Sequence, residues 1–139
     1  MIKTDNTKGE SLKEIKIRQR KEKEAELLAK CEAFAADKYG KDKLDEYRKK
    51  YDCIWFMSVM DEEDNIDALA IMRPVNRHIL SFASTKITDD GMYGFLEQCM
   101  RECWLEGDMR ILDEEEYFVP ASQEFNKIIE SKKVVFLKG

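Results

Sequence analysis

The middle of the chain alternates between short apolar runs and polar connections. Residues 53–60 and 66–72 are apolar and rich in residues that favour strands, and the acidic residues 61–65 separate them. Two such runs joined by a five-residue polar connection predict an antiparallel β-hairpin. Because two strands alone are marginally stable, we expect helices to cover one face of this hairpin.

The N-terminal part has a helical period. Residues 10–39 contain good helix formers and no helix breaker, and Gly40 fits the position just past a helix end. The first half is mostly charged, so it is expected either to project or to be ordered only by a partner. The second half is expected to pack on the rest of the protein, because its apolar residues recur at helical spacing. These residues are Leu27, Leu28, Cys31, Phe34 and Ala35. A shorter helix over residues 41–50 is expected to follow.

Helical patterns also follow the hairpin. Pro74 fits the first turn of a helix over residues 75–83, where its missing N–H costs nothing. Residues 88–106 predict an amphipathic helix, packed on the hairpin and ended by Gly107. Its apolar stripe consists of Met92, Phe95, Leu96, Cys99, Met100, Cys103 and Trp104. Pro120 is expected to begin a last helix through about residue 131. Residues 134–137 are β-prone, and they are expected to add an edge strand, pack against a helix or remain exposed as a docking segment.

These elements predict an α+β fold that is mainly helical, with a two-stranded antiparallel β-hairpin and a long charged N-terminal helix. We divide the chain into a helical arm, residues 1–50, and a small α+β domain, residues 51–139. At 139 residues with 43% apolar side chains, the chain is long enough for one domain with a modest core.

Charge is unevenly distributed between these two parts. Residues 1–50 carry 15 basic and 11 acidic side chains, whereas residues 51–139 carry 9 basic and 18 acidic ones. One interpretation is a solvated helix beside an acidic body. The sharper alternative is head-to-tail self-association into a homo-oligomer, or docking of a basic partner on the acidic body.

The composition also argues against several classes of protein. No apolar run approaches the length needed to cross a bilayer, so no membrane association is expected. The polar N-terminus lacks the apolar region of a secretory signal, so we expect a cytoplasmic protein. The basic residues between positions 13 and 23 are interrupted by glutamates and lack aromatic neighbours. We therefore expect no nucleic-acid binding, and we interpret this segment as a helix with i,i+4 ion pairs.

The residues that carry chemistry are sparse. The four cysteines are expected to be reduced, buried core thiols, because no CxxC motif is present and zinc normally needs four ligands. The single histidine, His78, lies in an ordinary helical pattern. No phosphate-binding glycine loop is present, and an EF-hand count from Asp61 places Ile66 and Met72 where glycine and glutamate are needed. We expect no catalytic residue, no metal and no cofactor.

Association with another protein is the remaining expectation. Surfaces suited to it are the N-terminal helix, the hairpin and the C-terminal apolar segment. The residues predicted to bind a partner are Trp55, Phe56, Leu27, Leu28 and Phe136.

The order of elements after residue 52 resembles a known family. A strand ends in Arg73-Pro74, two helices follow, the second carries Cys99 and Cys103 near its end, and an acidic segment leads to a last helix containing residues 125–129. Over roughly residues 52–137 this arrangement resembles the small tail assembly chaperones of tailed phages and prophages. The charged N-terminal helix departs from that pattern.

The resemblance implies a non-enzymatic protein of the bacterial host cytoplasm. It would bind a tape measure protein, mask its apolar helical surface and promote tail assembly, with Trp55 and the N-terminal helix in the binding surface. The alternative is a structural virion component that docks onto other subunits through its N-terminal helix.

Overall fold

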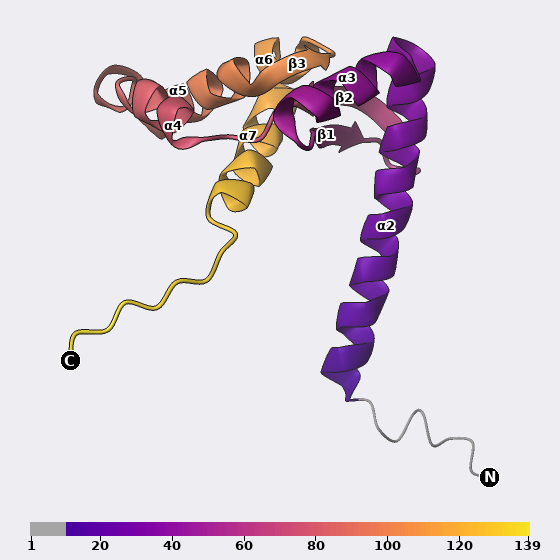
Figure 1. Cartoon of the computed structure of the whole chain (residues 1–139), viewed down its shortest axis with the longest axis horizontal. Helices are drawn as coiled ribbons and strands as arrows, with labels where there is room; N and C mark the ends of the chain where they lie inside the picture. The colour runs from indigo at the N-terminus through magenta and orange to yellow at the C-terminus, as the bar shows by residue number, and fades with distance from the viewer. Residues whose placement is uncertain (1–10) are drawn as a thin grey trace.

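A small antiparallel sheet lies at the centre of the protein. The computed structural model describes residues 11–139, and Figure 1 shows helices on both sides of the sheet. The strands are β1 (Trp55–Met60), β2 (Ile66–Met72) and β3 (Trp104–Gly107), in the spatial order β1-β2-β3. The α+β class and the hairpin of β1 and β2 are therefore confirmed. The prediction of two strands was wrong, because β3 pairs with β2 as a third strand.

The sheet has a separate apolar core on each face. Successive side chains of a strand point to opposite faces, and β2 is buried almost throughout. On one face, Leu69 and Ile71 pack with residues of α2 and α3. On the other, Ala68, Ala70 and Met72 pack with residues of α4 to α7. This three-layer arrangement explains the nearly continuous apolar character of the strands, since both faces of the sheet are covered.

The helices occupy most of the chain. Their bounds are α2 (Leu12–Tyr39), α3 (Lys41–Tyr51), α4 (Arg77–Ser84), α5 (Ile87–Cys103), α6 (Arg110–Asp113) and α7 (Glu115–Ile129).

The first helix ends at Tyr39, as the sequence predicts, and begins at Leu12, whereas the predicted first residue, 10, lies outside the described residues. The hydroxyl of Ser11 accepts a hydrogen bond from the N–H of Glu14, and the Glu14 carboxylate accepts one from the N–H of Ser11. This capping box satisfies two N–H groups that the helix leaves unpaired. Gly40 ends α2 with a φ of +93°, a conformation that glycine adopts readily.

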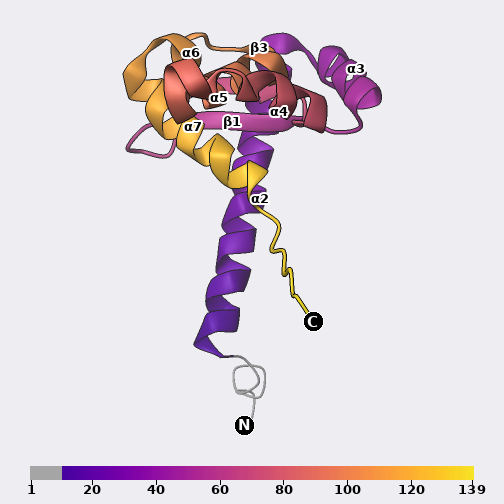
Figure 2. The same ribbon diagram turned by 90° about the vertical axis from the view of Figure 1, so that its left-hand side faces the viewer.

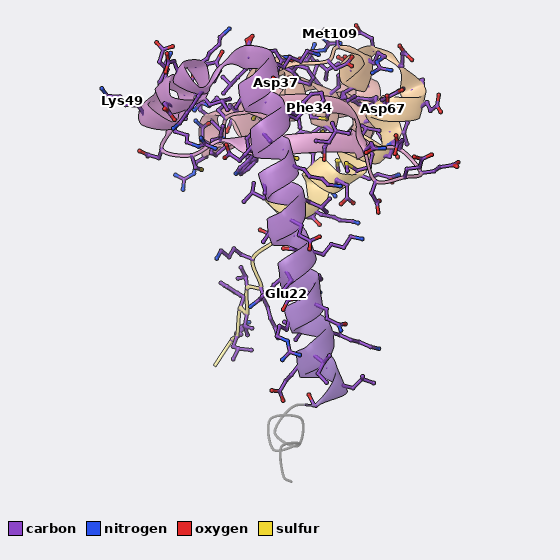
Figure 3. All side chains as sticks on the ribbon, turned by 90° about the vertical axis from the view of Figure 1, so that its right-hand side faces the viewer. Glu22, Phe34, Asp37, Lys49, Asp67 and Met109 are labelled. Carbon is purple, nitrogen blue, oxygen red and sulfur yellow. The ribbon has the colours of Figure 1, made fainter. Side chains whose placement is uncertain are left out.

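Residues 11–30, which we call the projecting arm, extend away from the body of the protein. Figures 1 and 2 show it leaving the body, and Figure 3 places Glu22 on the projecting part and Phe34 beside the body. The first buried residue of α2 is Cys31, and Lys30 Nζ donates a hydrogen bond to the backbone oxygen of Asp64 at 3.0 Å. The division of the chain into a helical arm and a domain at residue 50 stays a prediction. Leu44 of α3, which lies before that boundary, is buried against the sheet.

Because the arm has few contacts, we expect that deleting residues 1–23 leaves the thermal midpoint almost unchanged. Residues 1–10 of that segment lie outside the described residues. A shift below about 3 °C in a thermal melt followed by circular dichroism is expected. A loss of many degrees would show that the arm is packed in the folded protein.

Two predicted boundaries around α5 were wrong. The helix ends at Cys103 and Trp104 begins β3, so Gly107 ends a strand instead of a helix. The N–H of Arg73 donates to the oxygen of Cys103 at 2.8 Å, which ties the end of α5 to the end of β2. Pairing with β2 satisfies the backbone of β3, and this long-range gain outweighs the helical pattern that Trp104 would continue. The predicted packing of α5 on the hairpin is confirmed at the core that α5 shares with β2, and α7 and α2 contact β1.

The helices on either side of α5 also differ from their predicted bounds. Pro74 lies before α4, whose first turn is capped by the Asn76 side chain accepting from the N–H of Ile79 at 2.9 Å. Pro120 lies inside α7, which begins five residues earlier at Glu115. The carbonyl that Pro120 leaves without its helical N–H partner belongs to Glu116, an exposed residue that water can reach.

A candidate protein-binding groove

An open apolar groove lies between β1 and α7. Its volume is about 640 Å³, and β1 lines it along its whole length. Figure 2 shows α7 crossing beside β1. The α7 side is formed by Pro120, Ala121, Glu124, Phe125, Lys127 and Ile128, and Ser131 lies just beyond. The polar side chains from α7, Glu124 and Lys127, form an ion pair with 2.6 Å between Oε2 and Nζ. The groove therefore offers mainly apolar contacts and a charged rim.

The β1 wall of the groove is an edge strand. β1 pairs with β2 on one side, and within residues 11–139 no strand pairs with its other side. Alternate backbone N–H and C=O groups of β1 therefore point outward, free for another strand. Every residue of β1 is half-buried, whereas β2 is buried from Ala68 onward. The groove thus combines apolar side-chain contacts with unpaired backbone hydrogen-bonding groups.

The aromatic contact at one end of the groove holds its walls together. Trp55 of β1 meets Phe125 of α7 edge to face, with ring centroids 6.4 Å apart. Phe125 is completely buried, while Trp55 is half-buried and lines the groove. Trp55, Met57 and Val59 share this face of the sheet, and Phe56 packs on the opposite face, in the core that includes Cys31.

A polar network holds α7 at its N-terminal end. Tyr117 donates a hydrogen bond to the Asp67 carboxylate at 2.7 Å, and Arg110 donates to the Tyr117 hydroxyl at 2.9 Å. Arg110 also pairs with Asp108, with 2.7 Å between the guanidinium and Oδ2. The hydrogen bond from Arg110 lowers the pKa of the Asp108 carboxyl below its ordinary value. This network ties the first turn of α7 to Asp67 of β2.

The lowered pKa of Asp108 predicts a pH-dependent contribution to stability. An acid with a lowered folded-state pKa stabilises the protein above its ordinary pKa, and this contribution disappears as the pH falls through the folded value. Asp108→Asn is therefore expected to lower the melting temperature near neutral pH. The difference from the natural chain should close below the ordinary value of 3.8. Melting curves of both chains across this range test it, and a gap that persists in acid contradicts it.

The cysteines are unsuited to chemistry at three of their four positions. Cys31, Cys99 and Cys103 are buried, as predicted, and Cys53 is exposed, contrary to the prediction. Burial raises the pKa of Cys99 to about 11 and that of Cys103 to about 12, so both thiols are protonated near neutral pH. The side chains of Cys99 and Cys103 fill part of the apolar core between α5 and the sheet.

Other groups with catalytic or ligating potential do not gather. Among residues 11–139, no group of three or more His, Cys, Asp or Glu side chains is placed to hold a metal ion. His78 is exposed on α4 and is not among the residues that line the groove. Within the same described part, no helix is both long and apolar enough to cross a bilayer.

The structure places the predicted partner-binding residues at three separate locations. Trp55 and Phe56 both belong to β1, but only Trp55 packs on the α7 face of the sheet, whereas the Phe56 side chain packs on the opposite face. Leu27 is half-buried and Leu28 is exposed, both on α2 and outside the groove. Phe136 lies beyond α7 and is 94% exposed. Of the five predicted residues, Trp55 is therefore the one whose side chain faces the groove.

The α7 side of the groove contains none of the residues predicted to bind a partner. Ala121, Phe125 and Ile128 recur at intervals of three and four residues, which is the signal for one helical face. That signal shows a face but does not show that β1 lies opposite it.

No protein-family model matches the chain, and no curated protein or solved structure was found to be significantly similar to it. The function is therefore inferred from the groove and the surface residues.

Proposed function

We propose that this chain is a non-enzymatic assembly protein that binds an apolar segment of a protein partner in the groove between β1 and α7. The observation that carries the proposal is the open apolar groove beside an unpaired strand edge. Such a site binds a polypeptide through backbone hydrogen bonds and alternate side chains, or it accepts the apolar face of a helix. The groove offers no cluster of polar groups for chemistry.

The resemblance to tail assembly chaperones suggests the kind of partner. A phage tape measure protein is a long helical protein with apolar surface, and covering that surface keeps it soluble before assembly. The chain would act in the cytoplasm of the bacterial host. Trp55 and Ile128, on opposite walls of the groove, would provide apolar contacts to the bound segment.

The test is capture of the partner with a groove variant and a matched control. Ile128 lines the groove and is 43% exposed, and Ile87 lies on α5 outside the groove with 44% exposure. Ile128→Glu and Ile87→Glu therefore introduce the same charge at sites of equal exposure. We expect the tagged natural chain and Ile87→Glu to capture a long helical tail protein from a phage-producing lysate. Ile128→Glu should lose it, and capture unaffected by Ile128→Glu would contradict the proposal.

The projecting arm favours a second candidate function. α2 is capped at its start, and most side chains of residues 11–30 are exposed. A regular helix with so few contacts suits a structural virion component that inserts the arm between other subunits. Mass spectrometry of purified particles distinguishes the two functions, since a chaperone is absent from the finished particle and a structural component is retained in it.

A further inference from the structure

The C-terminal segment presents apolar residues that the folded body does not use. Val134, Val135, Phe136 and Leu137 follow α7 and are 66–94% exposed. Figures 1 and 2 show this segment leading away from the body in an extended course. Two valines and a phenylalanine, all of strong β propensity, precede Leu137, so this exposed apolar run is suited to pair as a strand with another sheet edge. We call residues 132–139 the tail.

The groove offers an unpaired strand edge and apolar contacts, which the exposed tail does not have. β1 is six residues long and has an unpaired edge, which is enough for a four-residue apolar strand. A strand added to β1 would direct two of the four apolar side chains toward the α7 face and two toward the α2 face. The backbone N–H and C=O groups of the tail would form hydrogen bonds with those at the edge of β1. Apolar surface of both segments would be buried away from water.

Charge also matches the tail to this end of the sheet. Lys132, Lys133 and Lys138 flank the apolar residues of the tail. The connection that follows β1 is acidic, with Asp61, Glu62, Glu63 and Asp64 all exposed. Because the tail is basic on both sides of its apolar core, a lysine would lie near these carboxylates in either strand direction.

The connection to α7 favours the groove of a second copy over the chain's own groove. Ser131 already lies at the groove, and the tail departs from it into solvent. Entering its own groove would require the chain to reverse direction within residues 130–133. Ser131 is the only residue of this stretch whose type favours turns, and the stretch contains no Gly, Pro, Asn or Asp.

We propose that two copies of this chain form a dimer by exchanging tails, each tail adding a strand to β1 in the partner's groove. The exchange is reciprocal, so one twofold axis covers both grooves and both tails. The dimer concerns the same groove as the proposed function, and a bound partner would have to displace the tail. Its test uses purified protein alone, so its outcome does not depend on that function.

The experiment is light scattering after size-exclusion chromatography over a dilution series. The natural chain and Ile87→Glu are expected at twice the monomer mass of 16.4 kDa. Deletion of residues 132–139, Phe136→Asp and Ile128→Glu are each expected to halve the apparent mass. Phe136 is exposed and outside the core, so its substitution tests the exchange without risk to folding.

A second measurement tests the site directly. A fluorescent peptide of residues 132–139 is expected to bind the tail-deleted chain by anisotropy, and the Phe136→Asp peptide is not. Three results would overturn the proposal: a natural chain that is monomeric throughout the series, a dimer that survives tail deletion, or an Ile128→Glu chain as dimeric as Ile87→Glu. A tail-dependent dimer that captures no partner from lysate would instead count against the proposed function alone.

Discussion

Phe125→Ala is expected to lower the free energy of unfolding by about 3–5 kcal/mol. Phe125 is completely buried at the centre of the core that α5 and α7 share with the sheet. Truncation removes its transfer free energy from water and leaves a cavity that rigid neighbours fill only in part. It also removes the edge-to-face contact with Trp55, so the wall of the groove loses its support.

The measurement is chemical denaturation followed by circular dichroism, with Phe82→Ala as the matched control. Phe82 lies on α4 and is 49% exposed, so the same truncation there should cost much less. Equal losses in the two variants would show that Phe125 is not in a close-packed core. A folded Phe125→Ala chain with reduced tail binding would show that this contact also shapes the groove.

Gly107→Ala is expected to destabilise the protein by about 1–3 kcal/mol through overpacking. A Cβ on Gly107 would lie 2.6 Å from Cζ2 of Trp104 and 2.8 Å from Cα of Ala70. Ala70 is the residue opposite Gly107 in the pairing of β2 with β3, and its backbone cannot move without disturbing that pairing. The substitution therefore weakens the third strand.

The control for this substitution is Gly139→Ala. No atom lies within 4 Å of a Cβ placed there, so its melting temperature should equal that of the natural chain. Thermal melts of the two variants compare the same added methyl group at a crowded and an open position. A neutral Gly107→Ala would mean that β3 lies farther from β2 than the structure shows.

Several elements could be predicted from local signals in the sequence. The helix ending before Gly40 follows from thirty residues without a helix breaker. Its capping box is formed by Ser11 and Glu14, which have the residue types and spacing of that motif. The hairpin follows from two apolar runs separated by Asp61 and its acidic neighbours. These features depend on contacts between residues close in sequence, and such contacts are the ones that periodicity reports.

The third strand could not be predicted in this way. Trp104 continues the apolar stripe of α5 by one more position, so its local pattern is helical. Its strand conformation depends on Met72, more than thirty residues earlier, which pairs with it across the sheet. A short segment with weak local preference takes the structure that its distant neighbours stabilise.

The candidate groove likewise combines features set by local sequence with features set by long-range packing. By itself, the sequence determined that β1 is a strand, that Phe125 and Ile128 share a helical face, and that residues 134–137 are apolar. Only the tertiary structure decided that β3 pairs with β2, and this pairing leaves β1 at the edge of the described sheet with α7 beside it. The reason is physical: side-chain periodicity is set by local backbone geometry, whereas strand order and helix placement are set by packing between distant parts of the chain.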